Sequence, residues 1–350
     1  MLNAQTTVVS RPDGRDDLSY LPTLTLGDYL REVVDGHPLL RSVLDFDRSG
    51  TRHALEVLAA TVTEFDTDET GRGDSYRLAQ RDASVRWIGT RQLLGLCTGS
   101  GPADAAVVLD ILGGDGLLSR AITQHAEAET AGITLVTGDI SAEMIVHALA
   151  QGLPAVRQAA EFLFLRDESV DAALLAYGTH HIAPAHRLTA IREALRVVRP
   201  GGRIVLHDFA EDSPMAAFFA EIVHYHTEIG HDYAHFSREL LDGLFAETSV
   251  PTEVLDMYDP LVVVGKTEAE ARRHMCDYVG AMYGVRGLFA ELGESGAWAL
   301  LERIFDHCGY LPRLRQNLEF PLAPIVYQRQ GEFVAEVPRV ALVAVGQKVS

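Results

Sequence analysis

The sequence predicts an α/β protein whose centre is a doubly wound, mostly parallel sheet. Two short runs of apolar and β-branched residues, Val107–Asp110 and Gly132–Asp139, each end in a carboxylate and lead into a helical pattern. The alternation of strand and helix continues through residues 100–227, as is typical of a parallel sheet covered on both faces. We therefore expect the carboxyl ends of the strands to form a binding crevice.

A glycine-rich turn follows the first of these strands. Residues 107–116 read Val-Val-Leu-Asp-Ile-Leu-Gly-Gly-Asp-Gly, and Leu117–Thr123 has the pattern of a helix start. Glycine supplies positive φ in a tight turn and lets a ligand approach bare backbone, although an ordinary strand-to-helix turn has a similar composition. Asp139, at the end of the second strand, is placed to accept hydrogen bonds from ribose hydroxyls. Together the two features indicate a nucleotide-binding corner.

Length and charge limit the kind of protein and partner. The 350 residues, of which 47% are hydrophobic, suffice for one large domain with additions or for two domains. A formal net charge of −19 disfavours nucleic acid and membrane surfaces as partners, so we expect a small-molecule substrate. Three separated cysteines, with no export signal and no apolar run of about 20 residues, predict a cytoplasmic protein without disulfides.

The N-terminal region, residues 1–98, is expected to be mostly helical. Residues 1–20 are polar and are interpreted as a loose tail. From Leu26 to Ala83, apolar residues recur at helical spacing, with a polar loop at residues 67–74.

An insertion is expected after the fifth strand. A helix at Met215–Tyr225 is followed, within residues 228–319, by further helical stretches and one short strand-like run. An insertion at this point would lie over the strand ends, so we expect a lid or a substrate-shaping subdomain.

The end of the chain returns to strand patterns. Residues 324–329 and 339–345 are apolar runs separated by a turn that contains Gly331. We expect them to close the sheet as an antiparallel C-terminal hairpin, so that the sheet domain comprises residues 99–227 and 320–350.

Four segments, in order, resemble the motifs of class I S-adenosylmethionine-dependent methyltransferases. They are the glycine turn Asp110–Gly116, the acid at Asp139-Ile140, the strand region Phe164–His181, and the helix, turn and strand at Leu195–Asp208. The resemblance implies a Rossmann-like fold and S-adenosyl-L-methionine as cofactor. The cofactor contacts that it implies are Asp110, Leu112, Gly114, Gly116, Asp139, Ile140 and Tyr177.

The resemblance also bears on the N-terminal region and has two departures. In this family N-terminal helices often cap the cofactor or form a homodimer contact, whereas simple packing is the alternative. Leu112 stands in place of the first glycine of the motif, and Gln158–Glu161 stands where the family often has an acid for the adenine amino group. These departures leave open a non-methylating protein that keeps the fold for binding, regulation or a rearrangement.

Histidines cluster after the strands that face the predicted crevice. His180 and His181 follow the fourth strand, and the segment His224–His235 follows the next helix. Imidazole is a common ligand of Zn and Fe. His180 and the Gly-His-Asp segment at His231 resemble metal-dependent 2-oxo-acid C-methyltransferases of the phenylpyruvate methyltransferase type, although the N-terminal region does not resemble that group's winged-helix dimerisation domain. The resemblance implies His180 and His231 as metal ligands, with Fe or Zn as the metal.

A metal at this place would favour carbon methylation of a 2-oxo acid. A C–H next to a ketone is weakly acidic, and a Lewis acid on the substrate oxygens stabilises the enolate that attacks the sulfonium methyl. A base must take the proton from the β-carbon, and the candidates are His181, His235 and Asp232.

Other chemistry remains open. In a metal-free O- or N-methyltransferase, one of the same histidines would act as general base toward a hydroxyl or an amine. Arg238, Arg272 and Arg273 are candidates for pairing a substrate carboxylate, with a solvated helix surface as the alternative.

Overall fold

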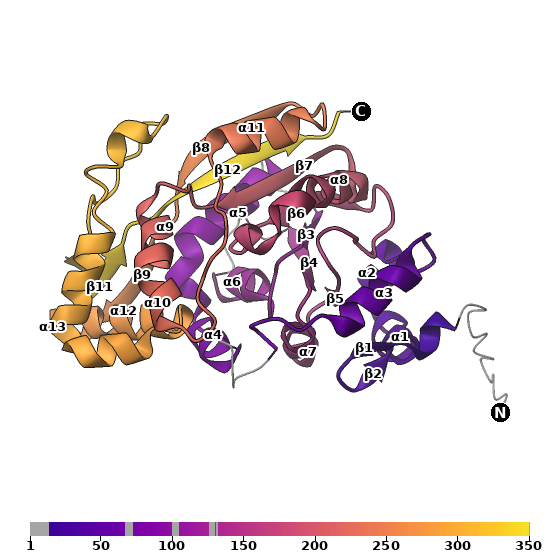
Figure 1. The fold of residues 1–350 in the computed structure, drawn as a ribbon, viewed down its shortest axis with the longest axis horizontal. Coiled ribbons are helices and arrows are strands. Elements are labelled where there is room, and N and C mark those ends of the chain that lie inside the picture. The colour runs from indigo at the N-terminus through magenta and orange to yellow at the C-terminus, as the bar shows by residue number, and fades with distance from the viewer. Residues whose placement is uncertain (1–13, 67–72, 100–104, 126–129, 131, 350) are drawn as a thin grey trace.

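A seven-stranded sheet forms the centre of the computed structural model, which describes residues 14–349 except 67–72, 100–104, 126–129 and 131 (Figure 1). The strand order is β5-β4-β3-β6-β7-β12-β8. The strands are β3 (Ala106–Asp110), β4 (Ile133–Asp139), β5 (Ala155–Arg157), β6 (Val170–Leu175), β7 (Val198–Asp208), β8 (Thr252–Tyr258) and β12 (Val340–Gln347). Strands β3 to β7 are parallel, whereas β12 is antiparallel to both of its neighbours. The predicted α/β sheet is confirmed.

Alternate residues of the central strands enter two apolar cores, one on each face of the sheet. Val108 belongs to one core and Leu109 to the other, and Leu174 and Leu175 divide in the same way. The first core takes in α5 (Trp87–Thr98) and α6 (Leu117–His125), and the second takes in α7 (Ala142–Ala150), α8 (Arg187–Val197) and α11 (Arg238–Ala246). The sheet is therefore the middle of three layers.

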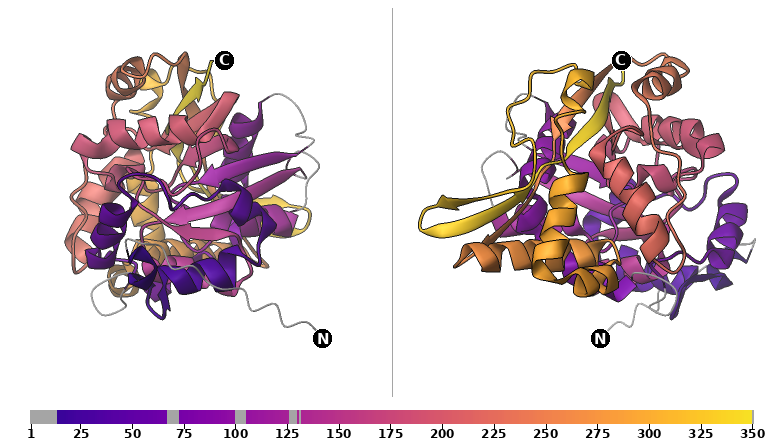
Figure 2. Two further views of the ribbon diagram at one scale, coloured as in Figure 1. Left: turned by 90° about the vertical axis from the view of Figure 1, so that its right-hand side faces the viewer. Right: turned by 60° about the vertical axis from the view of Figure 1, so that its left-hand side comes forward.

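Between β8 and β12 the chain leaves the main sheet. This insertion contains β9 (Leu261–Gly265), α12 (Glu268–Met282), α13 (Arg286–Ile304), a 3₁₀ turn at Leu311–Arg313, β10 (Ile325–Arg329) and β11 (Glu332–Val337). The hairpin of β10 and β11 extends beside α12 and α13 (Figure 2, right). The sequence placed the insertion at residues 228–319, but α11 and β8 lie within that range and belong to the main sheet and its covering layer.

The predicted C-terminal hairpin is wrong. Strand β10 pairs with β11, which in turn pairs with β9, in a separate three-stranded sheet. Strand β12 lies instead between β7 and β8. Every residue of Val340–Ala344 is buried, so this strand needs hydrogen-bonding partners on both edges, whereas β10 is largely exposed. The antiparallel edge of the sheet is thus β12 with β8.

A buried ion pair between Asp259 and Arg339 joins the two ends of the insertion, a place that we call the neck. Arg339 donates from Nη2 to Oδ2 of Asp259 at 2.8 Å and from Nε to the carbonyl oxygen of Asp259 at 2.9 Å. The Asp259 N–H donates to the Arg339 carbonyl oxygen at 3.0 Å. Burial alone would raise the pKa of Asp259, but the Arg339 charge holds it below its usual value. Two buried charges are tolerated when they are paired this completely, so the pair fixes where the insertion leaves and rejoins the sheet.

The N-terminal region consists of short elements. They are β1 (Ser19–Leu21), β2 (Leu24–Thr25), α1 (Leu26–Tyr29), α2 (Pro38–Val43), α3 (Thr51–Ala60) and α4 (Gly73–Ala79). There are also 3₁₀ turns at Arg15–Asp17 and Ala83–Arg86 and a π-helical turn at Leu30–Val34. Of the predicted tail, residues 1–13 lie outside the described residues. The rest of that prediction is wrong near Tyr20, whose buried ring packs on Tyr29 and whose hydroxyl donates to the Arg157 carbonyl oxygen at 2.7 Å. The predicted loop falls mostly on residues 67–72, which are also outside the described residues.

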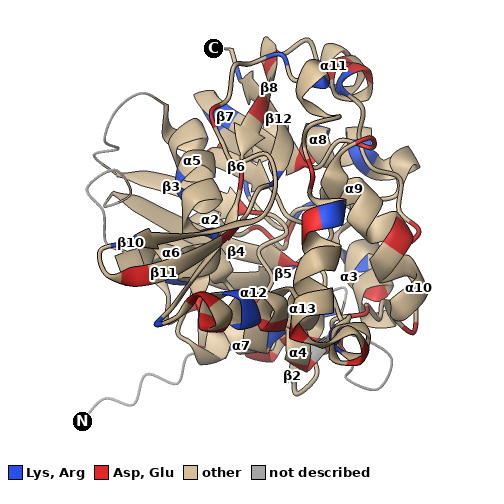
Figure 3. Cartoon of the chain, turned by 90° about the vertical axis from the view of Figure 1, so that its left-hand side faces the viewer, with Lys and Arg blue, Asp and Glu red and all other residues tan. Residues whose placement is uncertain are grey.

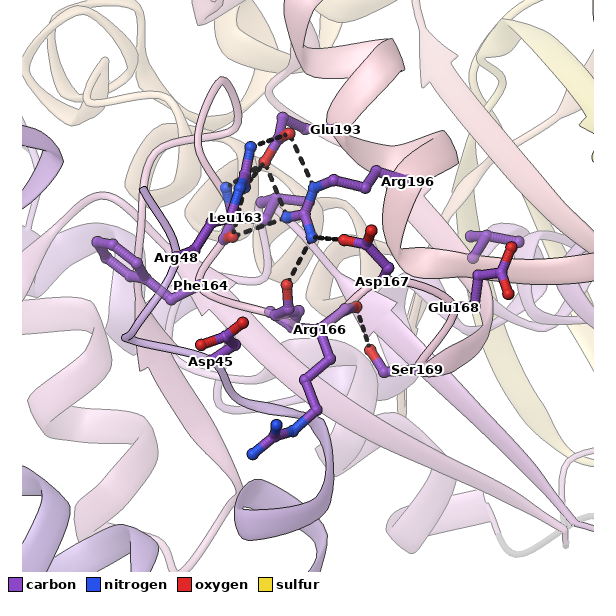
Figure 4. Close-up of polar contacts among 12 residues, drawn as sticks. Asp45, Arg48, Leu163, Phe164, Arg166, Asp167, Glu168, Ser169, Glu193 and Arg196 are labelled. Atoms are coloured by element: carbon purple, nitrogen blue, oxygen red, sulfur yellow. Dashed lines mark hydrogen bonds and ion pairs between the residues drawn. The ribbon is translucent and has the colours of Figure 1, made fainter. Parts of the chain in front are cut away.

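Polar contacts hold the N-terminal region against the sheet domain (Figure 4). The Glu193 carboxylate accepts from Arg48 at 2.6 and 2.8 Å and from Arg196 at 2.9 Å. Burial would raise the pKa of Glu193, but the hydrogen bonds from Arg196 and Arg48 lower it. The Asp45 N–H also donates to the Phe164 carbonyl oxygen at 2.9 Å. These bonds join α8, the segment before β6 and the N-terminal region into one support.

The surface carries charges of both signs. Acidic and basic residues both occur along α12 and α13 in the cartoon of Figure 3. Among the described residues, no helix has the length and apolar character needed to cross a membrane.

The close approach of α5 to the neck gives a stability prediction. A Cβ on Gly89 would lie 1.7 Å from Oδ1 of Asp259, so Gly89→Ala should destabilise the protein by about 1–3 kcal/mol. Gly95 lies on the same helix, and a Cβ there would meet no atom within 4 Å, so Gly95→Ala should be neutral or stabilising by about 0.5–1 kcal/mol. Thermal or urea unfolding of both variants checks this, and equal stability of the two would contradict it.

Candidate active site

The turn after β3 and the end of β4 form a backbone cradle at the carboxyl ends of the parallel strands. Gly114 and Gly116 have φ values of +57° and +89°, in the region that favours glycine. A Cβ on Gly116 would lie 2.2 Å from Cδ1 of Leu153. The Gly114 N–H donates to Oδ2 of Asp139 at 2.9 Å. The two motifs predicted to hold a nucleotide therefore meet.

The cradle contains two carboxyl groups of different character, the buried Asp110 and the half-buried Asp139. Burial raises the pKa of Asp139 to about 6, even though N–H groups of Ser141 and Gly114 donate to it. Burial and then the Asp139 charge raise the pKa of Asp110 to about 8. Near neutral pH, Asp139 is thus ionised and can accept from ribose hydroxyls, while Asp110 largely keeps its proton.

The remaining predicted cofactor residues line or support this cradle. Leu112 and Ile140 are half-buried and pack against the second core. Tyr177 follows β6 with a φ of +60°, unusual for a residue with a side chain, and its hydroxyl donates to Oδ1 of Asp259 at 3.2 Å. Gln158 begins the segment 158–161, for which no adenine contact is assigned. Its Oε1 accepts from the Phe164 backbone N–H at 2.9 Å, while its buried Nε2 has no hydrogen-bond partner among the described residues.

A cleft rich in histidine opens at the same end of the sheet, beside the ends of β6 and β7. We call it the histidine cleft. It is lined by Phe65, Tyr76, Arg86, Tyr177, His180, His181, His207, Asp208, Phe209, Phe219, His231, Tyr283 and Arg339. Its walls come from the N-terminal region, the sheet, the insertion and the helical segment after β7. This segment comprises α9 (Pro214–Phe218), a π-helical turn and α10 (His224–His226).

Asp208, the last residue of β7, organises the histidines. Its carboxylate accepts from the His180 N–H at 2.6 Å, faces Nδ1 of His180 at 2.9 Å, and lies 3.4 Å from Nδ1 of His235. Burial would raise the pKa of Asp208, but the charge and hydrogen bonds of His180 and His235 hold it well below its usual range. The Nε2 atoms of His180 and His235 are buried and have no hydrogen-bond partner among the described residues. Because Asp208 holds Nδ1 of His180, the Nε2 atom of the same ring points away from the Asp208 carboxylate.

His181 and His231 lie next to His180. Ligand atoms of the three histidines all lie within 4.8 Å of one another. His231 stacks on Phe219 with ring centroids 4.1 Å apart, and its N–H donates to Nδ1 of His224 at 3.1 Å. Phe219 begins a π-helical turn, Phe219–Val223, a feature often found at functional sites. The predicted ligands His180 and His231 are thus brought together.

Other predicted residues lie elsewhere. Asp232 is exposed and is not part of the cleft lining. Arg238 pairs with Asp256, and Arg272 pairs with Glu268. Arg273 is exposed on α12.

Sequence reasoning gave no role to several residues that line the cleft or lie beside it, although His207 was among the clustered histidines. Glu64 has a buried side chain whose Oε1 lies 3.7 Å from Nδ1 of His181. Arg86 and Arg339 reach the cleft from the N-terminal region and from the end of the insertion. His207, fully buried, has Nε2 3.5 Å from the carboxylate of Asp259. No local motif marks Glu64, Arg86 or Arg339, and Glu64 stands in a polar segment with several other acids.

Comparisons with known proteins match part of the chain to methyltransferases. Residues 109–206 match a family described as Methyltransferase domain. A demethylmenaquinone methyltransferase of Mycolicibacterium paratuberculosis is 31% identical over 133 residues, which are 38% of this chain and 51% of that protein. An uncharacterized methyltransferase of Mycobacterium tuberculosis is 39% identical over 108 residues, which are 30% of this chain and 40% of that protein. The chain thus spans about half or less of these relatives.

A solved structure also aligns with the chain. The YcgJ protein of Bacillus subtilis covers 75% of this chain and 99% of its own, with 17% identity and a TM-score of 0.46.

The raised pKa of Asp110 gives a pH prediction. A carboxyl group whose pKa is about 8 when folded and 3.8 when unfolded favours folding at low pH, and this contribution is lost as pH rises toward 8. Asp110→Asn should therefore gain stability relative to the wild type as pH rises from about 5 to 8. Thermal unfolding without ligand at several pH values measures this, with exposed Asp277→Asn as control. A difference that stays constant with pH would contradict the assignment.

Proposed function

Residues 109–206 form a domain of the class I S-adenosylmethionine-dependent methyltransferases, and from this premise we propose that the protein transfers a methyl group from S-adenosyl-L-methionine to a small molecule. One observation carries the proposal. The glycine turn closes on Asp139 through the bond from the Gly114 N–H, at the strand ends where the histidine cleft opens. A donor held in the cradle and an acceptor held in the cleft would then lie side by side.

The N-terminal region has the position needed to cap the cofactor. Asp66 accepts from the Ser141 hydroxyl at 2.6 Å and from the Glu143 N–H at 3.2 Å, at the start of α7. Residues 61–66 therefore lie beside Asp139. We propose that this segment caps the cofactor.

A homodimer formed through residues 1–98 is a separate prediction, and analytical ultracentrifugation of the purified protein would test it.

We infer further that the histidine cleft binds Fe or Zn through His180 and His231. Asp208 holds Nδ1 of His180, which leaves the buried Nε2 for a ligand. A carboxylate behind a histidine is the usual support of a metal-binding imidazole. The spacing of the ligand atoms of His180, His181 and His231, all within 4.8 Å, supports the same inference.

The reaction that fits best is methylation at the β-carbon of a 2-oxo acid. A bound metal would supply Lewis acidity toward the substrate oxygens and so favour the enolate. His181 and His235 are the candidates for taking the β-proton, because Glu64 lies behind His181 and Asp208 behind His235. Phe219, Tyr283 and the surrounding aromatic side chains would exclude water from the reacting carbon.

A second candidate is metal-free O- or N-methylation. The hydrogen bond from His180 to Asp208 is also the arrangement of a general base oriented by a carboxylate. In that case Nε2 of His180 would take the proton from a hydroxyl or an amine. The absence of any S-adenosylmethionine binding would instead favour a non-methylating protein that keeps the fold.

Cofactor binding is tested at Asp139. Asp139→Ala should weaken S-adenosylmethionine affinity by about 1–3 kcal/mol, because it removes charge-assisted hydrogen bonds to the ribose. Titration calorimetry measures the change, with Asp277→Ala, an exposed carboxylate on α12, as the matched control. If both variants bind as the wild type does, the ribose has been misplaced.

Metal binding is tested at the two histidines. His180→Ala and His231→Ala should each lose most of the bound metal, measured by elemental analysis, and the ligand-field absorption of a Co²⁺-substituted sample. His53→Ala, an exposed histidine of α3, should leave both readouts unchanged. If the protein keeps full activity after a chelator has removed its metal, the metal-assisted reaction is rejected and metal-free O- or N-methylation is favoured.

A further inference from the structure

One cationic side chain in the histidine cleft makes no hydrogen bond or ion pair with a carboxylate among the described residues. Arg86 ends the turn Ala83–Arg86 and is buried, with 4% of its surface exposed. Its Nε donates to the Tyr278 hydroxyl at 3.0 Å, and its guanidinium lies 4.8 Å from the ring centroid of Tyr177. Neither Nη1 nor Nη2 makes a hydrogen bond or ion pair with the described part of the chain. The open end of the guanidinium is therefore its terminal fork.

The Arg86 charge helps to lower the pKa of Asp259, but this carboxylate is already bonded to other groups. Oδ2 of Asp259 pairs with Arg339 at 2.8 Å and lies 3.5 Å from His207, and its Oδ1 accepts from the Tyr177 hydroxyl at 3.2 Å. Two guanidinium groups therefore share one carboxylate in this wall of the cleft. The other groups whose charge acts on Arg86 are the phenols of Tyr76, Tyr177, Tyr278 and Tyr283.

A buried guanidinium that shares one carboxylate with a second arginine is poorly compensated. A hydrogen bond to a phenol and contact with a ring recover only part of the hydration that a guanidinium loses. The retained, forked donor pair therefore points to an anion that arrives with a ligand.

We propose that Arg86 binds a carboxylate of the methyl acceptor, so that the substrates of this protein are small carboxylic acids. This inference rests on the proposed function, because it takes the histidine cleft as the acceptor site. The planar fork of Nη1 and Nη2 matches the two oxygens of a carboxylate, and the ring of Tyr177 lies beneath the pair. Arg86 would anchor the acceptor at one end of the cleft, with His180 and His231 among the residues of the same lining.

The test compares acids with their own esters. Pyruvate, phenylpyruvate and 2-oxoglutarate, and the methyl ester of each, are titrated into the full-length protein with and without S-adenosylhomocysteine. We expect at least one acid to bind about 10- to 100-fold more tightly than its ester. Arg86→Gln should abolish this preference, and Arg86→Lys should keep part of it.

Controls separate the anion site from folding and from the cofactor site. Arg329→Gln, an exposed arginine of β10, should keep the full preference for the acid. A purely structural role of Arg86 would lower thermal stability without changing the ratio of acid to ester affinity. Failure to bind S-adenosylmethionine would overturn the proposed function, whereas the ratio can still be measured in the cofactor-free protein.

Three results would overturn the proposal. They are binding of no acid in the panel, an acid preference that survives in Arg86→Gln, and binding of phenyl phosphate in place of every acid.

Discussion

The carboxylate of Asp208 is the constraint on which the histidine cleft depends. Asp208 is the last residue of β7. Its carboxylate accepts a hydrogen bond from the backbone N–H of His180, contacts Nδ1 of the same residue and faces Nδ1 of His235. A buried carboxylate must be compensated by such donors, so its position fixes two imidazoles at once. The side of His180 that remains is the one that can meet a ligand. Whether that ligand is a metal or a proton, Asp208 sets its place.

A second buried carboxylate, Asp259, gives the cleft its other wall. Its pairing with Arg339 ties the beginning of the insertion to its end and brings Tyr283 over the strand ends. The same carboxylate holds the hydroxyl of Tyr177, so the insertion and the sheet share one polar network. The cleft is therefore assembled from segments that are far apart in the chain. Its two walls differ in character, because Asp208 faces His180 and His235, whereas Asp259 pairs with Arg339 and also lies near His207.

The parts of this arrangement that depend on local sequence could be predicted. The glycine turn and Asp139 are read from neighbouring residues, and parallel strands bring their ends to one edge by geometry. Long-range features could not be predicted in this way. Strand β8 is mostly half-buried and has no strong apolar run, so its place beside β12 depends on tertiary pairing. Arg86 lines the cleft, and Glu64 lies beside His181, only because the N-terminal region folds back over the sheet, which no local motif indicates.

If cradle and cleft serve one reaction, the fate of the methyl group tests this most directly. The purified protein is incubated with S-adenosylmethionine carrying a ¹³C-labelled methyl group and with 2-oxo acids, and the products are followed by mass spectrometry and NMR. We expect one labelled methyl on the β-carbon of an acid for each S-adenosylhomocysteine formed. Label on oxygen or nitrogen, or no labelled product from any acid while the cofactor binds, would contradict this proposal.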